Sequence, residues 1–172
     1  PIARRLLASP EGKLRDAGIV RELIALLASP DERVRATAAH ALSHAAEPAA
    51  FSALAALMNE GESAWVLCQV GRALRTCADG TGGLRLLEWL EAARPELRYH
   101  SAKALGRFRH PAVVRALRAH LQDEAQVDLR MARANTVQDA VLQALLEIQE
   151  EKGVASRSKA DQIRFWMERI PE

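Results

Sequence analysis

Apolar side chains recur every three or four positions along most of the chain, the pattern of helices that bury one face. The first clear case runs from Gly18 to Ala28, and the segment Ser29-Pro30-Asp31-Glu32 interrupts it. There we expect Ser29 to cap the next helix, Pro30 to occupy its first position and Glu32 to complete a capping box. Alternating apolar segments and breaks predict four helical hairpins, at 18–44, 47–77, 82–109 and 111–150.

A segment of about ten residues recurs within these hairpins. Its anchor pair is Ala41-Leu42, which returns as Ala73-Leu74 after 32 residues and as Ala104-Leu105 after a further 31. A fixed period in this range marks stacked hairpins, because one hairpin cannot bury its apolar face alone. The sequence therefore predicts an all-α fold, a right-handed α-solenoid of about four hairpins without a β-sheet.

The C-terminal part departs from this period. Its anchor, Ala144-Leu145, comes 40 residues after the third copy, so about nine extra residues are expected in a loop around Gln126–Ala134. The segment 159–169 again has apolar residues at helical spacing and is expected to cap the array; docking on a partner or on a neighbouring domain is the alternative. We interpret 1–172 as one repeat domain, although the start at Pro1 rather than Met suggests a piece of a longer protein.

The repeat resembles the short HEAT-like repeats found in phycobilin lyases. The resemblance rests on two stretches, Pro30-Asp31-Glu32-Arg33-Val34-Arg35 with Ala38-Ala39 and Ala41-Leu42, and Pro95-Glu96-Leu97-Arg98 with Ser101-Ala102 and Ala104-Leu105-Gly106. It covers roughly Gly18 to Glu150. It implies that Arg35 and Arg98 pair with an acidic group or a carbonyl at a neighbouring hairpin turn, a structural role. The second copy departs from the pattern, because Leu67 replaces the arginine.

The resemblance also implies that the second helix of each hairpin lines the concave side of the array. If the Ala and Leu anchors face the core, a stripe at i, i+4, i+7 and i+11 faces away from it. In the first three copies this stripe is Arg33, Thr37, His40, His44; Trp65, Gln69, Arg72, Thr76; and Glu96, His100, Lys103, Arg107. In the fourth copy it is Thr136, Ala140, Gln143, Glu147.

Within this stripe the sequence predicts a polar to basic surface that binds a partner. Stacking should place His40, Arg72 and Lys103 in one row without interspersed carboxylates. Trp65 is expected at the edge, as a contact anchor or, alternatively, as a core residue. The predicted partner-binding residues are Trp65, Gln69, Arg72, His100, Lys103, Arg107, His40 and His44.

Charge is distributed unevenly along the 172 residues, although the net charge is only +2. Between Arg94 and Arg118 seven basic residues face one acidic residue, whereas from Ala119 onward ten acidic residues outnumber seven basic ones. The basic window is either a set of solvated helix faces or an anion-binding surface. Aromatic residues make up 4% of the chain, which fits closely packed helices better than a β-sandwich.

Candidate chemistry is sparse. His40 and His44 have a spacing that can hold a metal, but their helix supplies no further ligand at matching spacing and Arg72 would repel a cation, so we expect no metal site. No GxSxG, GxGxxG or phosphate-binding GK[ST] loop is present, so we expect no catalytic residues and no cofactor. The two cysteines form no CxxC and favour a cytoplasmic setting, and no apolar run approaches a membrane span.

Three functions fit this sequence. The first is a non-catalytic scaffold or adaptor that binds an acidic or carboxylate-bearing protein segment in the concave groove. The second is a module that binds anions or a nucleic-acid backbone. The third, favoured only by the resemblance, is a bilin lyase-like subunit that handles a chromophore.

Overall fold

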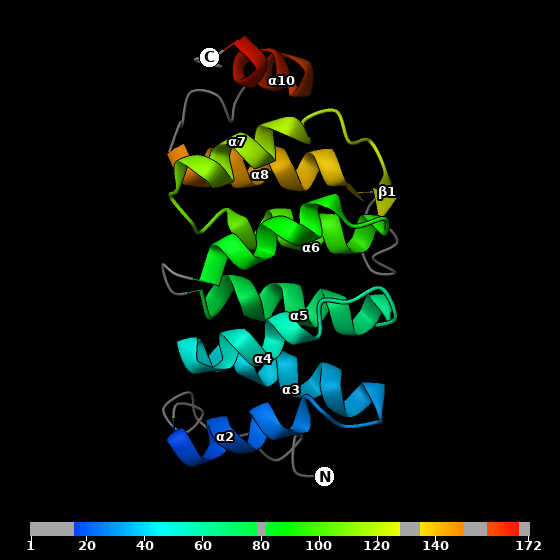
Figure 1. Ribbon diagram of the computed structural model, residues 1–172, viewed down its shortest axis with the longest axis vertical. Helices are drawn as coiled ribbons and strands as arrows, with labels where there is room; N and C mark the ends of the chain where they lie inside the picture. The colour runs from blue at the N-terminus through cyan, green and yellow to red at the C-terminus, as the bar shows by residue number, and fades with distance from the viewer. Residues whose placement is uncertain (1–15, 79–81, 128–134, 150–157, 169–172) are drawn as a thin grey trace.

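The helices of the computed structural model, which describes residues 16–78, 82–127, 135–149 and 158–168, pair into successive hairpins (Figure 1). The first hairpin is α2 (Ala17–Leu26) with α3 (Glu32–Ala45). The second joins η1 (Pro48–Ala50) and α4 (Phe51–Ala56) to α5 (Ala64–Thr76). The third is η2 (Gly82–Glu91) with α6 (Pro95–Leu105), and the fourth is α7 (Pro111–Ala119) with α8 (Val137–Gln149). The last described helix is α10 (Lys159–Glu168).

These hairpins stack along the long axis of the molecule, from α2 near the N-terminus to α10 near the C-terminus (Figure 1). The second helices form a continuous layer, because α3 packs on α5, α5 on α6 and α6 on α8. Each second helix also packs on the first helix of its own hairpin. We call α3, α5, α6 and α8 the inner layer and the first helices the outer layer. The predicted all-α solenoid is confirmed.

Small and branched aliphatic side chains fill the core between hairpins. The repeated anchors Leu42, Leu74, Leu105 and Leu145 are all 0% exposed. The alanines that precede them, from Ala41 to Ala144, are at most 1% exposed. Alanine at this position lets neighbouring inner helices approach closely, while each leucine fills the space between them. The repeated Ala-Leu pair is therefore the packing unit of the array.

The start of α3 differs from the expected capping box. The helix begins at Glu32, and Asp31 is its N-cap, whose carboxylate accepts the Arg33 N–H at 2.8 Å. Ser29 lies before the helix, and its hydroxyl accepts the Asp31 N–H at 3.2 Å. Aspartate satisfies the unpaired N–H groups of the first turn and also favours the positive end of the helix dipole. The prediction that Ser29 caps this helix was wrong by two residues.

The first helix of the third hairpin, η2, is a 3-10 helix of ten residues. Such a segment spans about 20 Å at about 2.0 Å per residue. The 13 residues of α5 span nearly the same length, at about 1.5 Å per residue. The tighter coil therefore lets a shorter segment cross the full width of the layer.

The extra residues of the fourth hairpin lie between α7 and α8. There β1 (Gln126–Val127) pairs antiparallel with β2 (Asn135–Thr136), with Gln126 opposite Thr136. The expectation of a fold without any β-sheet was wrong at this point. The inserted backbone needs hydrogen-bond partners of its own, and two extended segments satisfy each other. The rest of the expected insertion, residues 128–134, lies outside the described residues.

The helix α10 covers the end of the fourth hairpin. Its Trp166 is 0% exposed, and the Arg118 guanidinium of α7 lies over the indole ring, 5.7 Å from its centroid. The Lys159 ammonium pairs with Asp139 of α8 at 2.9 Å. A terminal helix of this kind shields the apolar face that a further repeat would otherwise cover. The expected capping helix is thus present.

Candidate functional site

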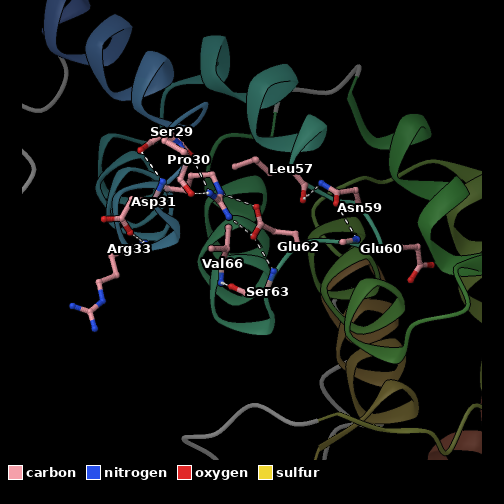
Figure 2. Close-up of polar contacts among 12 residues, drawn as sticks. Ser29, Pro30, Asp31, Arg33, Leu57, Asn59, Glu60, Glu62, Ser63 and Val66 are labelled. Atoms are coloured by element: carbon pink, nitrogen blue, oxygen red, sulfur yellow. Dashed lines mark hydrogen bonds and ion pairs between the residues drawn. The ribbon is translucent and has the colours of Figure 1, made fainter.

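An arginine at the start of α3 ties the first hairpin to the second. The Arg35 guanidinium donates to both carboxylate oxygens of Glu62, at 2.9 and 2.8 Å. It also donates to the carbonyl oxygens of Ser29 at 2.8 Å and Pro30 at 3.0 Å. Figure 2 shows these contacts between the loop at Ser29 and Pro30 and the loop that carries Glu62. Both hairpin loops are therefore fixed by one side chain.

The carboxylate of Glu62 is held in its charged form by this contact. Its burial alone would raise the pKa, but hydrogen bonds from Arg35 and from the Ser63 N–H outweigh burial, so the pKa of Glu62 lies below its usual value. A two-point contact between guanidinium and carboxylate is also geometrically specific.

The third hairpin repeats this arrangement. The Arg98 guanidinium donates to the Asp123 carboxylate at 2.7 and 3.2 Å, and to the carbonyl oxygens of Ala92 and Ala93 at 2.8 Å. Burial would raise the pKa of Asp123, but the hydrogen bond from Arg98 contributes to a net lowering. The predicted structural role of Arg35 and Arg98, pairing with an acid and with carbonyls at hairpin turns, is confirmed.

The second hairpin, where Leu67 replaces the arginine, obtains the same contact from the opposite direction. Leu67 is fully buried. The Arg94 guanidinium, from the loop before α6, donates back to the carbonyl oxygens of Glu60, at 3.3 Å, and Glu62. Arg94 also pairs with Glu96 at 3.1 Å. The loop carbonyls are thus still bound by a guanidinium, although it comes from the following repeat.

Seven of the eight predicted partner-binding residues lie on α3, α5 and α6 of the inner layer, and Arg107 follows the end of α6. The structure exposes them unequally. Trp65 is 44% exposed, which excludes the core alternative for this residue. Three others, His44, Arg72 and Arg107, are also exposed. His40, Gln69 and Lys103 are half-buried.

His100 does not lie on the accessible surface. It is 4% exposed, and its ring packs against α5 at Gly71. A Cβ at Gly71 would lie only 2.7 Å from His100 Nδ1, so the ring occupies space that another residue would fill. Burial, with the Lys103 charge as a smaller cause, lowers the pKa of His100 to about 3. The prediction of an exposed His100 was wrong, and His100 is a neutral core residue.

The α3 side of the surface is a histidine pair. The rings of His40 and His44 are edge to face, with centroids 4.8 Å apart. Burial is the main cause that lowers the pKa of His40, and the charges of His44 and Arg72 lower it further, while Gln69 opposes the shift. His40 is therefore next to Gln69 and Arg72 of α5, as the expected stacking of repeats requires.

The α6 side is a cluster of three cations and one carboxylate, formed by Arg72, Arg75, Lys103 and Glu147. Arg75 pairs with Glu147 of α8 at 2.8 Å. The pKa of Lys103 is lowered, mainly by burial and then by Arg75, while Glu147 opposes the shift. The sequence prediction missed Arg75 and its ion pair with Glu147, which lie beside Lys103. Glu147 was already in the fourth copy of the stripe, so the signal was present.

Comparison with known proteins supports the repeat interpretation. Residues 2–75 match the family model for HEAT repeats. Over these residues the chain is similar to HEAT-repeat proteins.

Solved structures show the same HEAT-like architecture over most of the chain. One is a chain of the complex of CpcE and CpcF of phycocyanin lyase from Nostoc sp. PCC7120, with a TM-score of 0.63, 23% identity and coverage of 86% of this chain. This HEAT-like chain spans 63% of the length of that protein. An engineered protein has a TM-score of 0.58 at 20% identity, with 96% of this chain and 88% of that chain covered. A second engineered protein has a TM-score of 0.52 at 21% identity, with coverages of 96% and 51%. No curated protein sequence matches significantly.

Within the described ranges, no group of three or more His, Cys, Asp or Glu residues is placed to hold a metal ion. No described helix is both long enough and apolar enough to cross a membrane. The two cysteines are free thiols, Cys68 half-buried and Cys77 buried.

Proposed function

We propose that this HEAT-like repeat protein is a non-catalytic scaffold or adaptor that binds a protein partner on the exposed face of the inner layer. One observation carries the proposal. The inner helices stack without interruption, and their outward side chains join an exposed tryptophan, Trp65, to a cationic cluster around Arg72 and Lys103. Tryptophan and arginine are the residues most enriched at energetically important interface positions.

The charge of this face favours an acidic or carboxylate-bearing segment as the partner. Arg72, Arg75 and Lys103 are opposed by Glu147 alone within the cluster, and the exposed Arg107 follows the end of α6. Complementary charge raises association rates and disfavours partners whose charge has the same sign as this face.

We further propose that the four hairpins and α10 act as one repeat domain. A cytoplasmic setting for it is supported by the two free thiols.

A pull-down from native lysate with matched variants tests this proposal. Arg72→Glu with Lys103→Glu should keep the fold and lose the partner, because it reverses the charge of the inner face. Arg85→Glu with Arg115→Glu makes the same charge change at exposed outer-layer positions and should retain the partner. If the inner-layer variant still captures the same partner, the binding face lies on the outer helices or on α10.

The same excess of cations supports a second candidate, binding of a nucleic-acid backbone. Phosphate contacts release counterions, so affinity would fall steeply with salt. Electrophoretic mobility shifts at two salt concentrations separate the candidates. A protein–nucleic acid complex that forms at low salt and dissociates at the higher salt concentration favours nucleic acid as the partner over a protein segment.

A further inference from the structure

The cation cluster already contains one carboxylate, which the fold itself supplies. Glu147 is bound to Arg75 at 2.8 Å, and the Gln143 side chain donates to the same oxygen at 3.0 Å. Gly106 leaves room for it, because a Cβ there would lie 2.9 Å from Glu147 Oε2. The pair is only partly shielded, with 35% of the Arg75 side chain and 26% of the Glu147 side chain exposed. Solvent and an incoming ion can therefore reach it.

Because Glu147 pairs with Arg75, the nearby Lys103 has no ion-pair partner among the described residues. Among the described residues no carboxylate lies within ion-pair distance of its ammonium, which sits over the Tyr99 ring at 5.5 Å from the centroid. Lys103 is half-buried, so it has lost part of its hydration without gaining a counter-ion. Arg72 is likewise without an ion-pair partner in the described part of the chain, and its charge acts on Lys103.

We propose that Lys103 and Arg72 form the anchoring site for a carboxylate of the partner's acidic segment, and that Glu147 competes with that carboxylate for Arg75, the third cation of the cluster. The proposal rests on the proposed function and specifies its chemistry. Three cations with one internal carboxylate leave room for a second, and a carboxylate beside Lys103 would offset the lost hydration of the ammonium. Glu147 then sets a threshold, because it satisfies Arg75 whenever no partner is present.

Fluorescein-labelled hexaglutamate, followed by anisotropy on the full chain, tests both parts. Lys103→Met keeps an unbranched apolar side chain but removes the charge, and it should weaken binding about two- to fivefold. Glu147→Gln should strengthen binding about two- to fivefold, because Arg75 is released to the ligand. The matched controls Arg115→Met and Glu22→Gln change charge equally at exposed outer-layer positions, and each should alter affinity by less than about twofold.

Circular dichroism confirms that each variant is folded, and Lys103→Gln replaces Lys103→Met if that variant is not. The inference is overturned if wild-type protein does not bind hexaglutamate, if Lys103→Met and Arg115→Met weaken binding equally, or if Glu147→Gln binds no better than Glu22→Gln. Tighter binding of a labelled hexathymidylate than of hexaglutamate also overturns it. Partner capture that still depends on the inner layer would then leave the proposed function standing.

Discussion

The His100 ring fills the space in which Gly71 has no side chain, and this contact joins α5 to α6. A Cβ at position 71 would approach His100 Nδ1 to 2.7 Å and His100 Cβ to 2.8 Å. The second of these atoms is held by the backbone of α6 and cannot swing away, unlike the end of a long flexible side chain. The close approach of the second and third hairpins therefore depends on glycine at one position and a flat ring at the other.

Gly71→Ala is expected to destabilise the protein by about 1–2 kcal/mol, because an overpacking cost of up to about 3 kcal/mol at the α5–α6 contact exceeds the gain of about 1 kcal/mol in helix propensity. Chemical denaturation monitored by circular dichroism measures the change. Gly61→Ala is the control, since a Cβ at this exposed position would be 3.5 Å from the nearest atom, Asn59 Oδ1, and should be nearly neutral. Equal stability of the two variants would show that α5 and α6 do not approach this closely.

Stability should fall as the pH falls from 7 to 5, because His100 has a pKa of about 3 in the folded protein. An unfolded histidine titrates near 6.5, so in this window only the unfolded state gains the proton, and stability present above pH 6.5 is lost. The expected loss from His100 is about 2 kcal/mol between these pH values.

His100→Gln should remove most of this pH dependence, and urea denaturation at pH 7 and pH 5 measures it. A smaller part should remain from His40, whose pKa is also lowered. An unchanged pH dependence in His100→Gln would contradict the buried, neutral state of this ring.

Glu62→Gln should destabilise the protein by about 2 kcal/mol, because it leaves the Arg35 guanidinium without its counter-ion in a largely buried contact. The two side chains are 17% and 6% exposed, so solvent replaces the lost contact poorly. The neighbouring Glu60 is exposed, and Glu60→Gln should change the free energy of unfolding by less than about 0.5 kcal/mol. Thermal unfolding of both variants compares them directly. A similarly small loss of stability in both would contradict a stabilising role for the Arg35–Glu62 contact.

Local pattern was enough to predict the helices and the repeated leucines that face the core. Leu42, Leu74 and Leu105 are fully buried because their helical phase and their fixed period both point to the repeat interface. The roles of Arg35 and Arg98 followed from the resemblance to HEAT-like repeats, which implied that both arginines pair at a neighbouring hairpin turn. Periodicity carries this information because each hairpin meets a nearly identical neighbour.

Tertiary structure alone decided what happens where neighbouring repeats differ. His100 is buried because the facing residue is Gly71, and Arg75 is paired because Gly106 lets Glu147 reach it from α8. Helical phase places a side chain on a face of its own helix, but the residues across the interface determine whether it is exposed, paired or enclosed. Those residues lie one or more repeats away in the chain, so no local pattern contains them.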